Sequence, residues 1–220
     1  MYQLLIGNKN YSSWSLRAWL ALRASGIAFS EQRYELGSKA FVRDVGRANP
    51  VGLVPVLLDD GFVVWDTLAI CEYVAERHPE AGVWPADARA RARARSLAAT
   101  MHSGFPALRQ AMPMNIEADL AGKGWSDAVA ADVDRILSLW GATREQFGAG
   151  GPFLFGAFCA ADAFFAPVVS RFVTYGVPVG EPHRAYMDAV LALPAMQEWM
   201  HDARQEKRFV AIDEPYRRSR

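Results

Sequence analysis

The sequence is poor in cysteine and histidine. It holds two cysteines in 220 residues, Cys71 and Cys159, which form no CxxC pair, and four scattered histidines without an HExxH motif. These absences exclude a disulfide scaffold and the familiar zinc sites, so we expect no metal. The scarcity of cysteine favours a reducing compartment, and we predict a cytoplasmic protein.

Long apolar runs and an excess of one charge are also missing. No stretch of 18 apolar residues occurs, and residues 1–6, which are apolar apart from Gln3, are followed by the polar residues 8–10. The sequence therefore predicts neither a membrane span nor a secretory signal. Lys plus Arg and Asp plus Glu both number 24, so the formal net charge is zero. A neutral chain offers no long-range attraction to nucleic acid or an anionic membrane, and we expect neither as a partner.

Hydrophobic residues make up 51% of the sequence, which is enough to fill a sizeable core. The length allows one or two compact units. Residues 1–79 alternate strand and helix patterns. The expected elements are a strand at 3–6, a helix closed by Gly26, a strand at 32–36, a short irregular helix at 38–48, a hairpin at 55–65 and a helix ending at His78. The hairpin is the clearest of these, because two apolar runs flank Asp59-Asp60-Gly61.

Strand patterns stop after residues 80–88, which resemble a linker. The expected helices cover 88 to about 112, 127–147, 160–175, 183–192 and 195–206. The 160–175 segment is almost entirely apolar and is therefore the candidate for a central, buried helix. Residues 216–220 read as a loose tail. The fold class predicted from these patterns is a small α/β unit followed by an all-α unit.

Three short segments carry groups that could hold a ligand. Tyr11–Ser15 stands where the first helix begins, and the start of a helix offers unpaired N–H groups and a partial positive charge. A serine hydroxyl there either caps its own helix or donates to an anion. Val54-Pro55 precedes the hairpin, which is typical of a cis-proline bend but also of an ordinary trans-proline. A cis bend would leave the backbone of Val54 free to pair with an extended peptide.

The third segment is Asp66-Thr67 at the start of the next helix. Its carboxylate, hydroxyl and N–H groups suit the charged head of an amino acid. The alternative is that the pair only caps the helix.

In their order along the chain, residues 10–17, 49–55 and 66–70 resemble the corresponding motifs of soluble glutathione transferases. They are similar to the serine-type zeta and theta classes and their bacterial relatives. Phe155-Gly156 and residues 159–162 resemble the family's capping motif on the central helix. The resemblance covers essentially the whole chain. It implies a thioredoxin-like glutathione-binding domain at 1–79, a linker at 80–88, an all-helical domain at 89–220 and a homodimer that serves in detoxification.

The resemblance also implies site roles. Matching the zeta-class pattern Ser-Ser-Cys-Ser to residues 12–15 makes Ser12 the hydroxyl that bonds the glutathione sulfur, whereas counting back from Arg17 as in the theta class gives Ser13. The remaining implied contacts are Val54 and Pro55 to the cysteinyl backbone, Asp66 and Thr67 to the γ-glutamyl group, Lys39 to the glycyl carboxylate, and Trp14, Met101 and Phe105 around the electrophile.

We therefore predict a transferase that conjugates or isomerises small electrophiles, with glutathione as co-substrate. A free thiol has a pKa of about 8.5, and a helix start with a hydroxyl donor lowers it. Trp14 replaces the zeta-class cysteine, which argues against maleylacetoacetate isomerase and against mixed-disulfide chemistry. Asp66-Thr67 replaces the usual Glu-Ser or Gln-Ser. An interaction or regulatory module with weak or no catalysis, and maleylacetoacetate isomerase, remain the alternatives.

Overall fold

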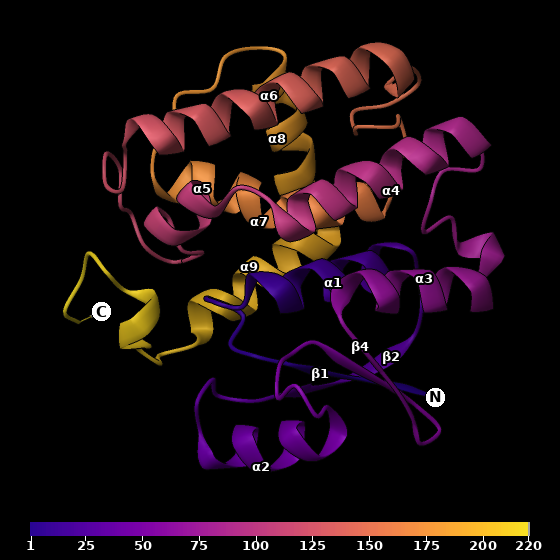
Figure 1. The fold of residues 1–220 in the computed structure, drawn as a ribbon, viewed down its shortest axis with the longest axis vertical. Coiled ribbons are helices and arrows are strands. Elements are labelled where there is room, and N and C mark those ends of the chain that lie inside the picture. Colours follow the sequence, from indigo (N-terminus) through magenta and orange to yellow (C-terminus); the bar gives the residue numbers. More distant parts are fainter. Residues whose placement is uncertain (220) are drawn as a thin grey trace.

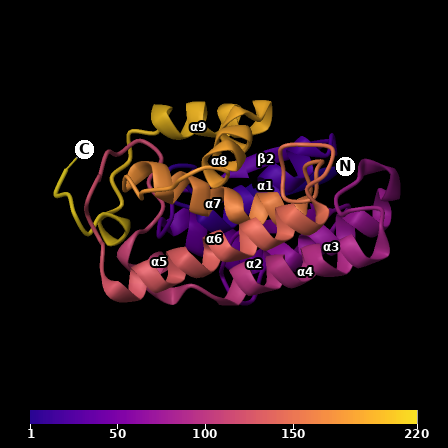
Figure 2. The same cartoon turned by 90° about the horizontal axis from the view of Figure 1, so that it is seen from above.

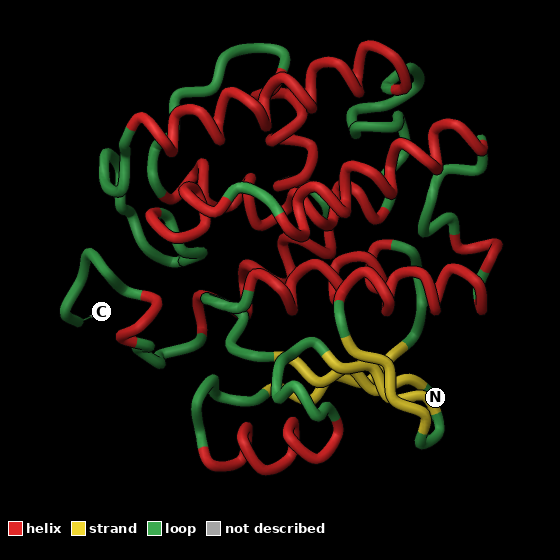
Figure 3. Tube along the Cα trace, in the orientation of Figure 1, coloured by secondary structure: helices red, strands yellow, loops and turns green. Residues whose placement is uncertain are grey.

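The computed structural model describes residues 1–219, and its first third is a four-stranded sheet between helices (Figure 1). The strands β1 (Tyr2–Ile6), β2 (Phe29–Arg33), β3 (Val56–Asp59) and β4 (Phe62–Trp65) lie in the order β2-β1-β3-β4. β1 runs parallel to β2 and antiparallel to β3. One face is covered by α1 (Ser13–Ala24) and α3 (Thr67–Arg77), and the other by α2 (Lys39–Ala48) (Figure 3).

Successive side chains of β1 point to opposite faces of the sheet and pack against different helices. Leu4 and Ile6 belong to the main core together with α1 and α3, whereas Leu5 packs with Val45 of α2. The β3–β4 hairpin turns at Asp60 (φ 46°) and Gly61 (φ 91°). Two successive positive φ angles are what a two-residue hairpin loop needs, so the predicted hairpin is confirmed.

The rest of the described chain consists of helices and the loops that connect them, with two short bridges near residue 155. The helices are α4 (Ala88–Ser103), α5 (Pro106–Ala111), α6 (Asp127–Phe147), α7 (Ala160–Thr174), α8 (His183–Ala192) and α9 (Pro194–Gln205), with short 3-10 turns at Pro79–Ala81 and Ala211–Asp213. None of the helices within residues 1–219 is long and apolar enough to cross a membrane. We call residues 1–77 the α/β part and residues 88–205 the helical part.

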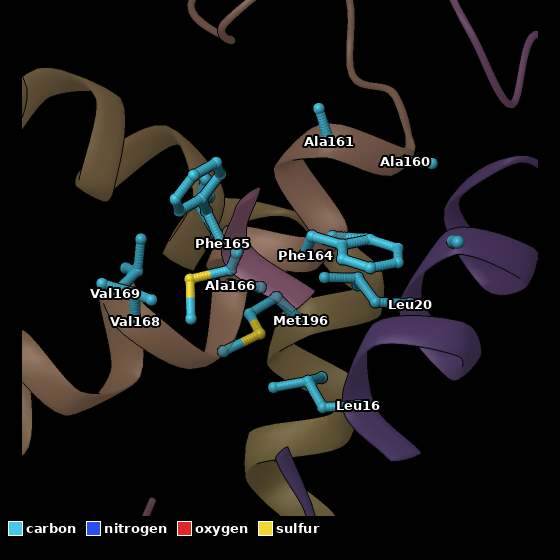
Figure 4. Packing of buried hydrophobic residues seen from close by; sticks show 14 of the residues in the cluster. Leu16, Leu20, Ala160, Ala161, Phe164, Phe165, Ala166, Val168, Val169 and Met196 are labelled. Atoms are coloured by element: carbon cyan, nitrogen blue, oxygen red, sulfur yellow. The ribbon is translucent and has the colours of Figure 1, made fainter. Parts of the chain in front are cut away.

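The central helix is α7, as predicted, and it packs against α1, α4 and α8 (Figure 2). Figure 4 shows Phe164 of α7 beside Leu20 of α1, so the two parts share one core. The capping motif predicted before α7 is present, since Asp162 accepts hydrogen bonds from the N–H groups of Cys159 (2.9 Å) and Leu154 (3.1 Å). Burial raises the pKa of Asp162 to about 6.

Two predicted elements differ from the structure. The second strand covers residues 29–33 rather than 32–36, because pairing with β1 begins at Phe29. β2 is a largely exposed edge strand, so its sequence shows no apolar pattern. The expected single helix from 88 to about 112 is two helices. Phe105 adopts a left-handed φ of 59° before Pro106, and a proline disfavours helical geometry in the residue before it.

The C-terminal segment is held against the helical part through Tyr216 and Arg217, so the expected loose tail is wrong for these two residues. No contact tests the prediction for Arg218 and Ser219, and Arg220 lies outside the described residues. Tyr216 donates a hydrogen bond to the carbonyl of Ala111 (2.6 Å), and Arg217 forms ion pairs with Glu117 and Glu214. Glu214 is buried and accepts a hydrogen bond from Tyr11 of the α/β part (2.7 Å). The end of the chain is thus tied to the loop before α1.

A buried lysine also joins the two parts. The Lys9 ammonium lies 2.8 Å from Glu31 and 2.7 Å from Asp202 of α9. It stands over the rings of Trp19 (4.9 Å) and Trp199 (5.3 Å), a cation–π arrangement that contributes further attraction.

Candidate active site

The start of α1 presents two serine hydroxyls to a cavity. Ser12 is the N-cap of the helix and is 7% exposed, while Ser13 is 9% exposed. Ser12 Oγ lies 2.8 Å from Ser15 Oγ, which accepts a hydrogen bond from the N–H of Gly7 (3.1 Å). The Ser13 hydroxyl has no hydrogen-bond partner within residues 1–219. Because the first N–H groups of a helix carry partial positive charge, an anion is stabilised here.

Two adjoining cavities lie between the α/β part and the helical part. The first, of about 550 Å³, is lined by Tyr11, Ser12 and Ser13 of the α/β part, by Arg109 and Arg171 of the helical part, and by Asp213 of the C-terminal segment. The second, of about 400 Å³, contains Pro55, Asp66, Thr67 and His102. Trp14, Leu53 and Val54 line both. The shared residues place the two cavities side by side along the Val54 bend.

The bend at Val54 leaves backbone groups free. The Val54–Pro55 peptide is cis, as the cis-proline interpretation expected. Asn49 holds the loop before it, because its Nδ2 donates to the carbonyl of Leu53 (2.8 Å) and its Oδ1 accepts from the N–H of Val51 (2.9 Å). Within the described residues the backbone N–H and C=O of Val54 have no partner. They are therefore available to pair with an extended peptide.

Asp66 caps α3 and still faces the second cavity. Its Oδ1 accepts from the N–H of Leu68 (2.8 Å), and its Oδ2 lies 3.1 Å from Nε2 of His102. Thr67 is fully buried, and its hydroxyl donates to the carbonyl of Trp14 (3.4 Å). The carboxylate thus serves as a helix cap without losing its capacity for a ligand, since a carboxylate has about four lone-pair sites.

Two arginines of the helical part line the first cavity. Arg171 is 4% exposed; its Nε donates to the carbonyl of Met112 (2.7 Å) and its Nη1 to that of Pro167 (3.2 Å). Burial, with the nearby charge of Arg109, lowers the pKa of Arg171 to about 10. Arg109 stacks over Trp14 at 4.8 Å. Neither forms an ion pair with a carboxylate in the described chain, although Asp213 lines the same cavity and its charge acts on Arg171. Two guanidinium groups against one carboxylate leave this wall positive, which favours an anionic ligand.

The structure brings most of the predicted site residues together. Ser12, Ser13, Trp14, Val54, Pro55, Asp66 and Thr67 all line the paired cavities. Lys39 does not: it is exposed at the first turn of α2. Met101 and Phe105 do not line the cavities either, because both side chains are buried in the core.

Sequence reasoning missed His102, Arg109, Arg171 and Asp213. Arg171 had a usable signal, since it is a lone cation in an otherwise apolar helical stretch.

Comparison with known proteins agrees with this geometry. A family model described as "Glutathione S-transferase, N-terminal domain" matches residues 11–77, and one described as "Glutathione S-transferase, C-terminal domain" matches residues 123–202. The chain belongs to the glutathione S-transferase family. The predicted thioredoxin-like and all-α architecture is thereby confirmed.

Two curated relatives of this transferase-family chain are a probable maleylacetoacetate isomerase of Caenorhabditis elegans and a zeta-class glutathione S-transferase of Euphorbia esula. The first is 33% identical over 44% of this chain and 45% of its own length, and the second is 29% identical over 74% and 73%. The chain therefore spans about half the length of the first relative and about three quarters of the second.

Among solved structures, a glutathione transferase homologue from Burkholderia GL BGR1 with bound glutathione has a TM-score of 0.69 at 28% identity. The match covers 92% of this chain and 97% of the homologue. A tau-class glutathione S-transferase from Mangifera indica has a TM-score of 0.70 at 24% identity, covering 92% and 95%, and supports the fold alone.

Proposed function

We propose that this protein is a glutathione-dependent transferase or isomerase that acts on small electrophiles. The observation that carries the proposal is the pair of adjoining cavities, which share Trp14 and Val54. A tripeptide lying along the Val54 bend would put its γ-glutamyl group at Asp66 and its sulfur over the start of α1. The Burkholderia homologue is described with bound glutathione, which supports glutathione as the ligand.

Ser12 is the proposed donor to the glutathione sulfur. In this structure Ser12 Oγ donates to Ser15 Oγ (2.8 Å), which also accepts from the N–H of Gly7 (3.1 Å). A bound thiolate would accept the Ser12 hydrogen bond instead, with the Ser15 hydroxyl donating back to Ser12 Oγ. Such a chain polarises each of its hydrogen bonds. Ser13 is the second candidate, because its hydroxyl is uncommitted within the described chain. A helix start and a hydroxyl donor both stabilise the thiolate, which then attacks an electrophilic carbon.

The electrophile is proposed to carry a carboxylate. Arg109 and Arg171 stand across the first cavity from the serines and form no direct ion pair with a carboxylate among residues 1–219, so the single nearby carboxylate, Asp213, does not neutralise both. A planar guanidinium pairs with a carboxylate through two parallel hydrogen bonds. Binding there would hold the electrophilic carbon near the sulfur. The same pair of arginines supports isomerisation of an unsaturated dicarboxylate as the second candidate reaction.

Two experiments with the purified protein test the proposed activity. We expect the protein to be retained on immobilised glutathione and to conjugate glutathione to an activated aryl halide. Absence of glutathione binding by calorimetry would contradict the proposal and favour an interaction or regulatory module. Direct assay of maleylacetoacetate as substrate separates the isomerase from the conjugating enzyme.

An arginine variant tests the carboxylate preference. We expect Arg109→Gln to lower kcat/KM for a carboxylate-bearing electrophile by roughly 10- to 100-fold, because one charged hydrogen bond is lost. The kcat/KM for a neutral aryl halide should change by no more than about twofold. Arg89→Gln, at an exposed position of α4, is the matched control. An equal loss for both electrophiles would contradict a carboxylate subsite.

We also propose a homodimer. Phe62 is 61% exposed on β4 and lines a shallow hollow with Trp65, Leu68 and Tyr73, an apolar patch of the kind that marks protein interfaces. We expect Phe62→Glu to shift the protein from dimer to monomer in analytical ultracentrifugation, whereas Val173→Glu, at an exposed position of α7, should remain dimeric. A wild-type monomer would contradict the proposal.

We further propose a cytoplasmic location. We also propose two domains, at 1–79 and 89–220, with a linker at 80–88. The two buried, unpaired cysteines support a reducing compartment. Within residues 1–219 no strand follows β4, and α4 begins at Ala88; both observations support the division.

A further inference from the structure

The helical part contributes one side chain to the second cavity. His102 lies in the last turn of α4, and its Nε2 is 3.1 Å from Oδ2 of Asp66 at the start of α3. Both residues line the 400 Å³ cavity together with Thr67 and Trp14. The contact joins elements that are 36 positions apart in the sequence numbering, 102 against 66.

The two oxygens of Asp66 have different partners. Oδ1 is directed to the backbone of α3, where it accepts from Leu68 and Ala69. Oδ2 is the oxygen that His102 contacts. With Oδ1 and Oδ2 both fixed, the carboxylate cannot rotate, and its remaining lone pairs have a defined direction.

The surroundings of His102 favour its neutral form. Trp14 packs edge-on against the imidazole at 4.8 Å, and Nδ1 is buried without a hydrogen-bond partner in the described chain. The charged groups that face it are Asp66 of α3, Arg17 of α1 and Arg109 of α5. Burial lowers the pKa of His102, the two arginines lower it further, and Asp66 opposes them. A neutral imidazole donates Nε2–H to Asp66 and leaves the carboxylate its negative charge.

We propose that His102 is a positioning residue for glutathione: it holds the Asp66 carboxylate in the orientation that accepts the γ-glutamyl ammonium. This inference rests on the proposed function, because it assigns the second cavity to the γ-glutamyl group. It makes the glutathione site a product of both parts of the molecule, since α4 supplies the group that orients a ligand on α3.

Steady-state kinetics of His102→Ala and His102→Gln test the role. We expect His102→Ala to raise KM for glutathione about 10-fold with kcat within about twofold, because the ammonium contact contributes to binding rather than to the attack. The glutamine amide has a donor at a similar reach, so His102→Gln should recover most of the affinity. His201→Ala, at an exposed position of α9, is the control.

A ligand that lacks the ammonium separates positioning from a structural effect. Glutaryl-cysteinylglycine has the shape of glutathione without its amino group, and we expect the wild type and His102→Ala to bind it equally in calorimetry. We also expect KM for glutathione to rise as the pH falls through the pKa of His102, since an imidazolium would compete with the ammonium for Asp66. This rise should be missing in His102→Gln.

The results that would contradict the positioning role differ from the result that would contradict the proposed function. An unchanged KM in His102→Ala, or an equal loss of affinity for glutathione and the glutaryl analogue, overturns the positioning role while the proposed function stands. Failure of the wild type to bind glutathione at all overturns both.

Discussion

Replacing Ser12 by alanine is expected to lower kcat/KM for conjugation of glutathione to an activated aryl halide about 100-fold. The loss of one oriented donor to a developing or stabilised anion costs an enzyme factors of about 10² to 10³. Without the Ser12 hydroxyl, the bound thiol would have a higher pKa and less of it would be thiolate at neutral pH. Ultraviolet titration of the thiolate in the glutathione complex measures that pKa directly.

Ser13→Ala is the matched comparison, because the two serines are adjacent and both line the cavity. We expect a smaller loss of activity in Ser13→Ala. A larger loss there would transfer the role to Ser13, and full activity in both variants would contradict a serine-stabilised thiolate. Ser12 also caps α1, accepting from the N–H of Ser15, so Ser12→Ala should lose about 1 kcal/mol of stability, which circular dichroism must show to be tolerated.

Replacing Lys9 by methionine is expected to lower the free energy of unfolding by about 3 kcal/mol, the low end of the cost of removing one partner from a buried ion pair. The change leaves Glu31 and Asp202 facing each other without their cation and removes the charge between Trp19 and Trp199. The low end applies because the two carboxylates are 30% and 43% exposed and keep some hydration. Urea unfolding followed by tryptophan fluorescence measures the difference.

Arg23→Met is the control for Lys9→Met. Arg23 pairs with Glu198 of α9 across the same junction, but both side chains are exposed to water, at 44% and 42%. Exposed ion pairs contribute about 0–1 kcal/mol, so we expect a small effect. A similar loss of stability in both variants would show that burial of the Lys9 cation is not what anchors α9.

The elements that depend on neighbouring residues in the sequence could be predicted. The β3–β4 hairpin depends on a few consecutive residues around Asp60-Gly61, and α6 was predicted at the bounds it has in the structure. β2 was misplaced because an exposed edge strand needs no apolar pattern and takes its register from β1. The break at Phe105 depends on one left-handed residue before Pro106, which an apolar and alanine-rich stretch conceals.

The site residues were likewise predictable where they lie in short motifs and missed where tertiary packing places them. Ser12, Val54 and Asp66 each lie in a short motif, so sequence reasoning selected them before the structure placed them at the two cavities. The helical part was harder, because only tertiary packing decides which face of α4 meets the cavity. Met101 was selected, whereas its neighbour His102 lines the cavity. Successive helical residues point about 100° apart, so a one-residue error exchanges the core for the site.

The anchored C-terminal segment makes the first cavity depend on residues that follow the last long helix. Asp213 lines the cavity into which Ser12 opens, and Glu214 holds Tyr11 beside it. A variant cut after Gln205 would keep the sheet and the helices α1 to α9, yet it would lack Asp213 and the Glu214 contact. Such a cut would damage the proposed electrophile subsite and leave the proposed γ-glutamyl subsite at Val54, Asp66 and His102 complete.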